Sequence, residues 1–150
     1  MSAASGPAPD KAAWAQPWGI TLGVFALSNL GNAAWMLADP LHWYLNLPAN
    51  VPGSGPLNEH FVRDIGCIFG LIGVALAIAA FRPAARFGAL LIASGFYGAH
   101  AAVHVYDSLR GLFEPGQWLV DLVPIYGATG LLIALTVVYA SSQDRVGHSR

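Results

Sequence analysis

The sequence predicts an all-α protein, a four-transmembrane-helix bundle with antiparallel up-down topology. The chain has 150 residues, the length of one domain, of which 55% are hydrophobic and only 10% are charged. An average soluble domain is about 25% charged, so a soluble enzyme and a disordered chain are both excluded. The net charge of −1 provides no basic surface, so we expect no nucleic-acid partner. Four apolar stretches reach the roughly 20 residues that a helix needs to cross a bilayer.

The chain divides into two tails and one membrane domain. Segment 1–16 is rich in Ala, Pro and Ser and has no apolar run, so we expect a disordered cytoplasmic tail rather than a signal peptide. The four-helix transmembrane domain is expected over 17–140, and a second cytoplasmic tail over 141–150. The expected spans are 18–37, 61–81, 87–105 and 118–139.

The second and third spans are joined only by Arg82–Arg86. Such a short link requires the two helices to be antiparallel neighbours. Gly66 and Gly70 of the second span are expected to let the third span approach closely, because small residues bring helix backbones together in membranes. Pro124, in an early turn of the fourth span, is expected to bend that helix.

Basic residues near the ends of the spans predict the orientation, because cytoplasmic loops carry the excess of Lys and Arg. Both termini and the turn after the second span share one side, which makes that side cytoplasmic in a bacterial inner membrane. This side holds Lys11, Arg82, Arg86, Arg145 and Arg150, and the opposite side holds only Arg63 and Arg110.

The outer loop over 38–59 is long for a helix bundle and rich in Pro, Gly and Asn. Trp43 and Tyr44 in this loop are expected to rest on the bilayer surface, where aromatic side chains concentrate. A lid over a binding site is the alternative interpretation of the same loop.

Ionisable residues of the second and third spans gather at the outer border of the membrane. His60 and Asp64 have the i, i+4 spacing of one helix face, and His100, His104 and Asp107 share a face of the third span. Because the two spans are neighbours, we expect the two polar stripes to face each other. Ionisable groups at this depth are costly and therefore indicate a functional site.

Three imidazoles and two carboxylates are ligands that suit Cu, Zn, Fe or Mn. We therefore predict a transition-metal site formed by His60, Asp64, His100, His104 and Asp107, in metal handling or as an accessory to a membrane redox complex. The alternative is a structural or assembly subunit, in which Arg63 and Arg110 neutralise the two carboxylates and the cluster only locks helices together. A b-type haem is disfavoured because His60 lies too near the border, and a quinone site or a small transporter is a weaker hypothesis.

Other polar residues within the spans have simpler interpretations. Asp121 is expected to interact with the dipole of the fourth helix, and Asn29 and Asn32 to join helices by hydrogen bonds. Cys67 lies in an apolar run, and we expect a buried, inert thiol. No nucleophile elbow, phosphate loop or dinucleotide motif is present, and the sequence leaves open whether the protein is an enzyme.

Two segments carry a resemblance to known proteins: Asn58-Glu-His-Phe-Val-Arg-Asp64 and His100-x-x-x-His104-x-x-Asp107. With these residues the chain resembles the DoxX-like and DUF4345-type families of small bacterial membrane proteins. The resemblance extends from the first span to the fourth. It implies a four-helix inner-membrane protein and no particular reaction. The partners we expect are the lipid bilayer and other membrane subunits or a further copy of the chain.

Overall fold

The structure, a computed structural model, describes residues 16–147, and every regular element in that range is helical. Its long helices are α1 (Pro17–Ala38), α3 (Glu59–Phe81), α4 (Arg86–Leu109) and α6 (Ala128–Gly147). A short helix α5 (Gln117–Asp121) and a π-helical segment (Leu122–Gly127) precede α6 and extend the fourth span. The four predicted spans are therefore confirmed as helices long and apolar enough to cross a membrane.

The last helix continues past the predicted end of the fourth span, into the segment that the sequence assigned to the second tail. The first predicted tail, apart from Gln16, and residues 148–150 lie outside the described residues.

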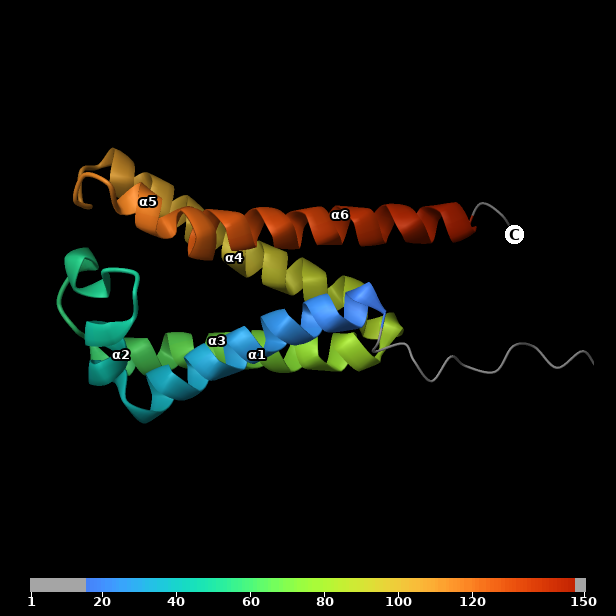
Figure 1. Cartoon of the computed structure of the whole chain (residues 1–150), viewed down its shortest axis with the longest axis horizontal. Coiled ribbons are helices and arrows are strands. Elements are labelled where there is room, and N and C mark those ends of the chain that lie inside the picture. Colours follow the sequence, from blue (N-terminus) through green and yellow to red (C-terminus); the bar gives the residue numbers. More distant parts are fainter. Residues whose placement is uncertain (1–15, 148–150) are drawn as a thin grey trace, which may run out of the picture.

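The helices form two antiparallel pairs (Figure 1). Helices α1 and α3 pack against each other along their length, and α4 packs mainly against α6. Helix α4 starts beside the end of α3, at the 3₁₀ turn Pro83–Ala85, and then diverges from α3 toward the end of the molecule that carries α2 (Pro40–Asn46) and α5. We call this the outer end, after the side that the sequence predicts for it. The short link does make α3 and α4 neighbours, and they still touch at mid-depth, where the ring centroids of Phe69 and Phe96 are 5.3 Å apart.

Close packing between α1 and α3 depends on glycines of α3. A Cβ atom added at Gly73 would lie 2.7 Å from Leu30 Cγ and 3.0 Å from the Leu30 backbone nitrogen. A Cβ added at Gly66 would lie 3.0 Å from Met36 Cβ. The expectation that Gly66 and Gly70 serve the contact between the second and third spans is therefore wrong, since both face α1, where a Cβ added at Gly70 would lie 3.7 Å from Ala33 Cβ.

The interior is apolar and is shared by all four helices. Leu22, Leu76, Leu90 and Leu132, one from each long helix, have no exposed surface. Large apolar side chains also cover the outside, as expected for helices surrounded by lipid rather than water. Among the most exposed are Leu27, Leu71 and Val123.

The opposite end of the bundle, which we call the inner end, is closed by polar contacts to backbone carbonyls. Arg86 is buried, and its guanidinium donates to the carbonyl oxygens of Ala79 at 3.1 Å and Ala80 at 3.5 Å. These are carbonyls at the end of α3 that lack partners within the helix. Tyr139 donates its hydroxyl to the carbonyl of Pro83 at 2.8 Å and packs edge-on against Trp18. This end therefore ties α1, α6 and the turn after α3 together.

We expect Gly73→Ala to lower the free energy of unfolding in detergent by about 1–3 kcal/mol, because the new methyl group would overlap Leu30. The matched control is Gly95→Ala in α4, where an added Cβ meets nothing within 4 Å. Its helix should be as stable or more stable by up to about 1 kcal/mol. Thermal unfolding of both variants checks this, and equal stabilities would contradict the assigned contact between α1 and α3.

Candidate functional site

The outer loop folds back over the end of the bundle instead of lying extended. It contains helix α2 (Pro40–Asn46), whose first turn is capped by the Asp39 carboxylate accepting from the His42 amide. Trp43 is buried, and its indole N–H donates to Asn32 Oδ1 of α1 at 2.8 Å. The expectation that Trp43 rests on the bilayer surface is therefore wrong. The indole finds its hydrogen-bond partner inside the protein instead of at the membrane interface.

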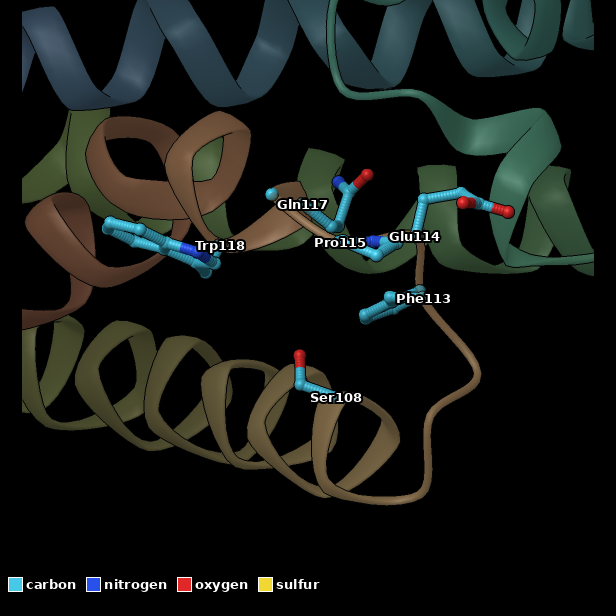
Figure 2. Close-up of a pocket in the computed structure, with 7 residues that line it drawn as sticks. Ser108, Phe113, Glu114, Pro115, Gln117 and Trp118 are labelled. Atoms are coloured by element: carbon cyan, nitrogen blue, oxygen red, sulfur yellow. The ribbon is translucent and has the colours of Figure 1, made fainter.

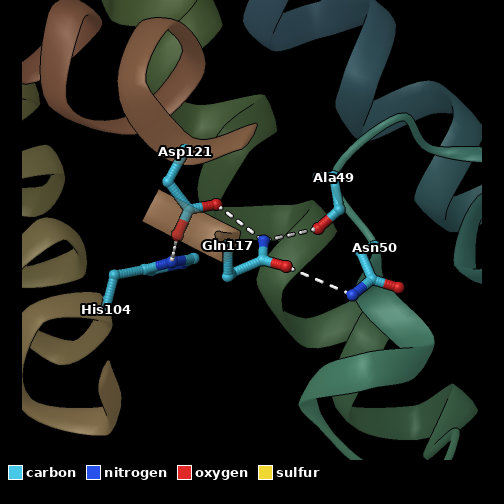
Figure 3. Close-up of polar contacts among 5 residues, drawn as sticks. All are labelled: Ala49, Asn50, His104, Gln117 and Asp121. Atoms are coloured by element: carbon cyan, nitrogen blue, oxygen red, sulfur yellow. Dashed lines mark hydrogen bonds and ion pairs between the residues drawn. The ribbon is translucent and has the colours of Figure 1, made fainter. Parts of the chain in front are cut away.

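A buried polar network joins this loop to α5 and α4 (Figure 3). Asp121 Oδ2 lies 2.7 Å from His104 Nδ1, and Gln117 Nε2 donates to Asp121 Oδ1 at 2.9 Å. The same Gln117 nitrogen donates to the carbonyl of Ala49 at 3.1 Å, and Asn50 Nδ2 donates to Gln117 Oε1 at 3.1 Å. Both oxygens of Asp121 and both polar atoms of the Gln117 side chain are therefore occupied.

The network is enclosed by protein. Asp121 is 0% exposed and Gln117 is 6% exposed. Every fully enclosed side-chain nitrogen or oxygen in the described part of the chain has a hydrogen-bond partner. A buried carboxylate without partners would be strongly destabilising, whereas this one is paired with an imidazole and an amide. The network is thus a stabilising element and not an open site.

Aromatic rings surround the two histidines of α4. The ring centroids of His100 and His104 are 4.7 Å apart, and His100 stacks parallel to Phe96 at 5.9 Å. Phe113, from the turn between α4 and α5, lies 5.5 Å from the His104 ring. Together with the bond from Asp121 to Nδ1, these contacts fix the orientation of the His104 ring.

The structure does not bring the five predicted metal ligands together. His60 Nε2 and Asp64 Oδ2 lie 3.5 Å apart on α3, with side chains 89% and 60% exposed. They point away from the bundle, while His100 and His104 are half-buried beside Asp121. Asp107 makes no hydrogen bond or ion pair with another described side chain. Within residues 16–147, no group of three or more His, Cys, Asp or Glu side chains is arranged to hold a metal ion.

The predicted ligands stay apart because the polar stripes of α3 and α4 point in different directions. Helix α3 buries the opposite face against α1, and α4 diverges from α3 toward the outer end (Figure 1). The structural alternative expected Arg63 and Arg110 to pair with Asp64 and Asp107, and these ion pairs are not formed either. Arg63 pairs with Glu59 at 3.0 Å, and Arg110 lies over the ring of Tyr106, so neither arginine neutralises Asp64 or Asp107.

Sequence reasoning assigned Asp121 to the helix dipole and did not single out Gln117. The i, i+4 spacing of these two residues at the start of the fourth span was an available signal. A second signal is Pro124, which cannot donate a backbone hydrogen bond. The segment Leu122–Gly127 around it is π-helical, and such segments are frequent at functional sites.

A small pocket of about 170 Å³ lies beside the network (Figure 2). Gln117 lines this pocket and also belongs to the network, so the amide separates the pocket from the buried carboxylate. Its walls are completed by Ser108, Phe113, Glu114, Pro115, Gly116 and Trp118.

A second set of hydrogen bonds joins the helices at mid-depth. Tyr97 of α4 donates its hydroxyl to Asn29 Oδ1 of α1 at 3.2 Å, and Thr129 of α6 donates to the carbonyl of Tyr97 at 3.1 Å. The expectation that Asn29 and Asn32 join helices is therefore confirmed. Cys67, in contrast, is exposed on α3, so the expectation of a buried thiol is wrong.

Comparison with known protein families, with curated proteins and with solved structures finds no match to this chain.

We expect Asp121→Ala to destabilise the protein by about 3 kcal/mol, because it leaves His104 and Gln117 without their shared partner inside the protein. Asp107→Ala is the matched control, since this carboxylate makes no hydrogen bond or ion pair with another described side chain, and it should change stability by less than about 0.5 kcal/mol. Thermal unfolding in detergent measures both. A small effect of Asp121→Ala would show that the network does not hold the outer end.

Proposed function

We propose that this integral membrane protein is a structural subunit that assembles with a second copy of itself in a bacterial inner membrane. The observation that carries the proposal is the position of His60 and Asp64. They lie on the face of α3 that no other part of the described chain covers. This is the structural and assembly hypothesis drawn from the sequence. In the proposal, however, the network around Asp121 holds the helices together, in place of the predicted His/Asp/Arg cluster.

The outward face of α3 comprises His60, Asp64, Cys67, Leu71 and Ile78. These residues share one side of the helix by their spacing, and all of them are exposed. The opposite side, with Val62, Ile72 and Leu76, is buried. An acid and a histidine are therefore continuous with an apolar stripe on the side directed away from the bundle.

The pattern of charges on this face favours a second copy of the chain as its binding partner. The first turns of α3 carry two acids and two bases, arranged as the i, i+4 pairs Glu59–Arg63 and His60–Asp64. Such a surface is complementary to itself, as a two-fold symmetric contact requires. Covering Asp64 with protein also removes the cost of a carboxylate that faces lipid below the border.

The buried network around Asp121 favours the same proposal, because its residues already have a role in the fold. Asp121, Gln117 and His104 satisfy one another, so they serve the fold, and neither carboxylate oxygen of Asp121 is left over for a ligand. His60 and Asp64, in contrast, pair only with each other on the outward face of α3.

A second candidate function, metal handling or support of a redox complex, is favoured by one arrangement. His100 and His104 are adjacent, and Asp121 binds Nδ1 of His104. A carboxylate on one ring nitrogen commonly orients the other toward a metal. Only two imidazoles are available here, so the remaining ligands would have to come from outside the chain.

Cross-linking tests the assembly. A short bismaleimide added to membranes should join two copies through Cys67, the single cysteine of the chain. Leu71→Trp should abolish most of this product, because the larger side chain lies in the middle of the proposed contact. Leu27→Trp on α1 is the matched control, since Leu27 and Leu71 are 73% and 71% exposed, and it should cross-link like the wild type. Equal yields from the two variants, or none from the wild type, would contradict the proposal.

Labelling tests the orientation, in which both termini are cytoplasmic. In a Cys67→Ser background, Ser54→Cys in the outer loop should react with an impermeant maleimide applied to intact cells. Ala84→Cys in the turn after α3 is the control, because it is equally exposed in the structure but should react only after the membrane is permeabilised. The reverse pattern would invert the topology.

A further inference from the structure

We infer that a zinc ion, or a transition metal of similar ligand preference, bridges two copies of the chain through His60 and Asp64 of each. This inference rests on the proposed self-assembly and names the ligand of the contact. It assigns to the outward face of α3 the metal that the sequence placed between the second and third spans.

The spacing of the two donor atoms fits one ion. Zinc lies about 2.0–2.1 Å from histidine nitrogen and about 2.0–2.2 Å from carboxylate oxygen, so two ligands of a tetrahedral ion are roughly 3.4 Å apart. His60 Nε2 and Asp64 Oδ2 are 3.5 Å apart. The pair therefore has the separation of two ligands without any movement of the helix.

A single chain provides half of such a site. Tetrahedral zinc needs four ligands, and the described residues hold no group of three that could bind a metal. A two-fold axis along the membrane normal places the partner's His60 and Asp64 at the same depth as those of the first copy. Two carboxylates then balance the charge of the divalent ion, and two imidazoles complete its ligands.

The surroundings of His60 and Asp64 leave both side chains accessible to a metal ion. His60 is the second residue of α3, at the border where ions arrive from water, and its side chain is almost fully exposed. Arg63 is bound to Glu59 at 3.0 Å, so its guanidinium does not occupy Asp64. At the alternative location beside His104, both oxygens of Asp121 are already taken by His104 and Gln117.

The test uses the full-length protein in detergent, stripped with a chelator and then loaded with zinc alone. Elemental analysis should find about one zinc per two chains. His60→Ala and Asp64→Ala should each weaken zinc binding by roughly 100-fold, at least as much as the loss of a residue that is hydrogen-bonded to a metal ligand. His42→Ala, another exposed histidine at the outer end, and His100→Ala are the controls and should retain zinc. Chelation should also reduce cross-linking through Cys67.

The outcomes separate the bridging ion from the assembly itself. A dimer that cross-links equally with and without zinc, or contains none, would overturn the ion and leave the assembly standing. A monomer that never cross-links would overturn both, and one zinc per monomer would overturn the bridge. Zinc lost in His100→Ala but kept in His60→Ala would instead support the second candidate function.

Discussion

A carboxylate enclosed within a membrane-embedded protein must find hydrogen-bond partners for both oxygens, and this constraint shapes the outer end of the molecule. Asp121 meets it with His104 and Gln117. Gln117 in turn needs acceptors and donors, which the loop supplies at Ala49 and Asn50. The hydrogen bonds that satisfy the buried Asp121 therefore fix the position of α5 against α4, and also that of the outer loop between α1 and α3.

The seam between the two helix pairs depends on polar contacts at three depths. The hydroxyl of Tyr139 binds the turn at the inner end, Tyr97 binds Asn29 in the middle, and Gln117 binds Asn50 at the outer end. Lipid chains are as apolar as the side chains they replace, so burial of apolar surface contributes little to association between helices in a bilayer. Hydrogen bonds and close backbone contacts, such as those at Gly73, do most of this work.

The four spans were predictable, because twenty apolar residues in a row have few other uses than crossing a membrane. The depth of the polar residues was predictable for the same reason, through the rise per residue. Which helix covers a given face was not. Spacing shows that Gly66 shares a side of α3 with Gly73, but whether that side meets α1 or α4 depends on the packing of the whole bundle. The pairing of Asp121 with His104 was missed for this reason, since His104 lies on another helix, 17 positions away in the chain.

The contact between Asn50 and Gln117 joins residues 67 positions apart in the chain. During synthesis the first helix pair emerges well before the second, and its glycine-mediated packing needs nothing that comes later. The loop that follows α2, in contrast, has to wait for α5 before its amides and carbonyls are satisfied. The outer end thus closes only after α5 has been made, because Ala49 and Asn50 lack their Gln117 partner until then. The inner end closes later still, since Tyr139 of α6 binds the carbonyl of Pro83 and packs against Trp18.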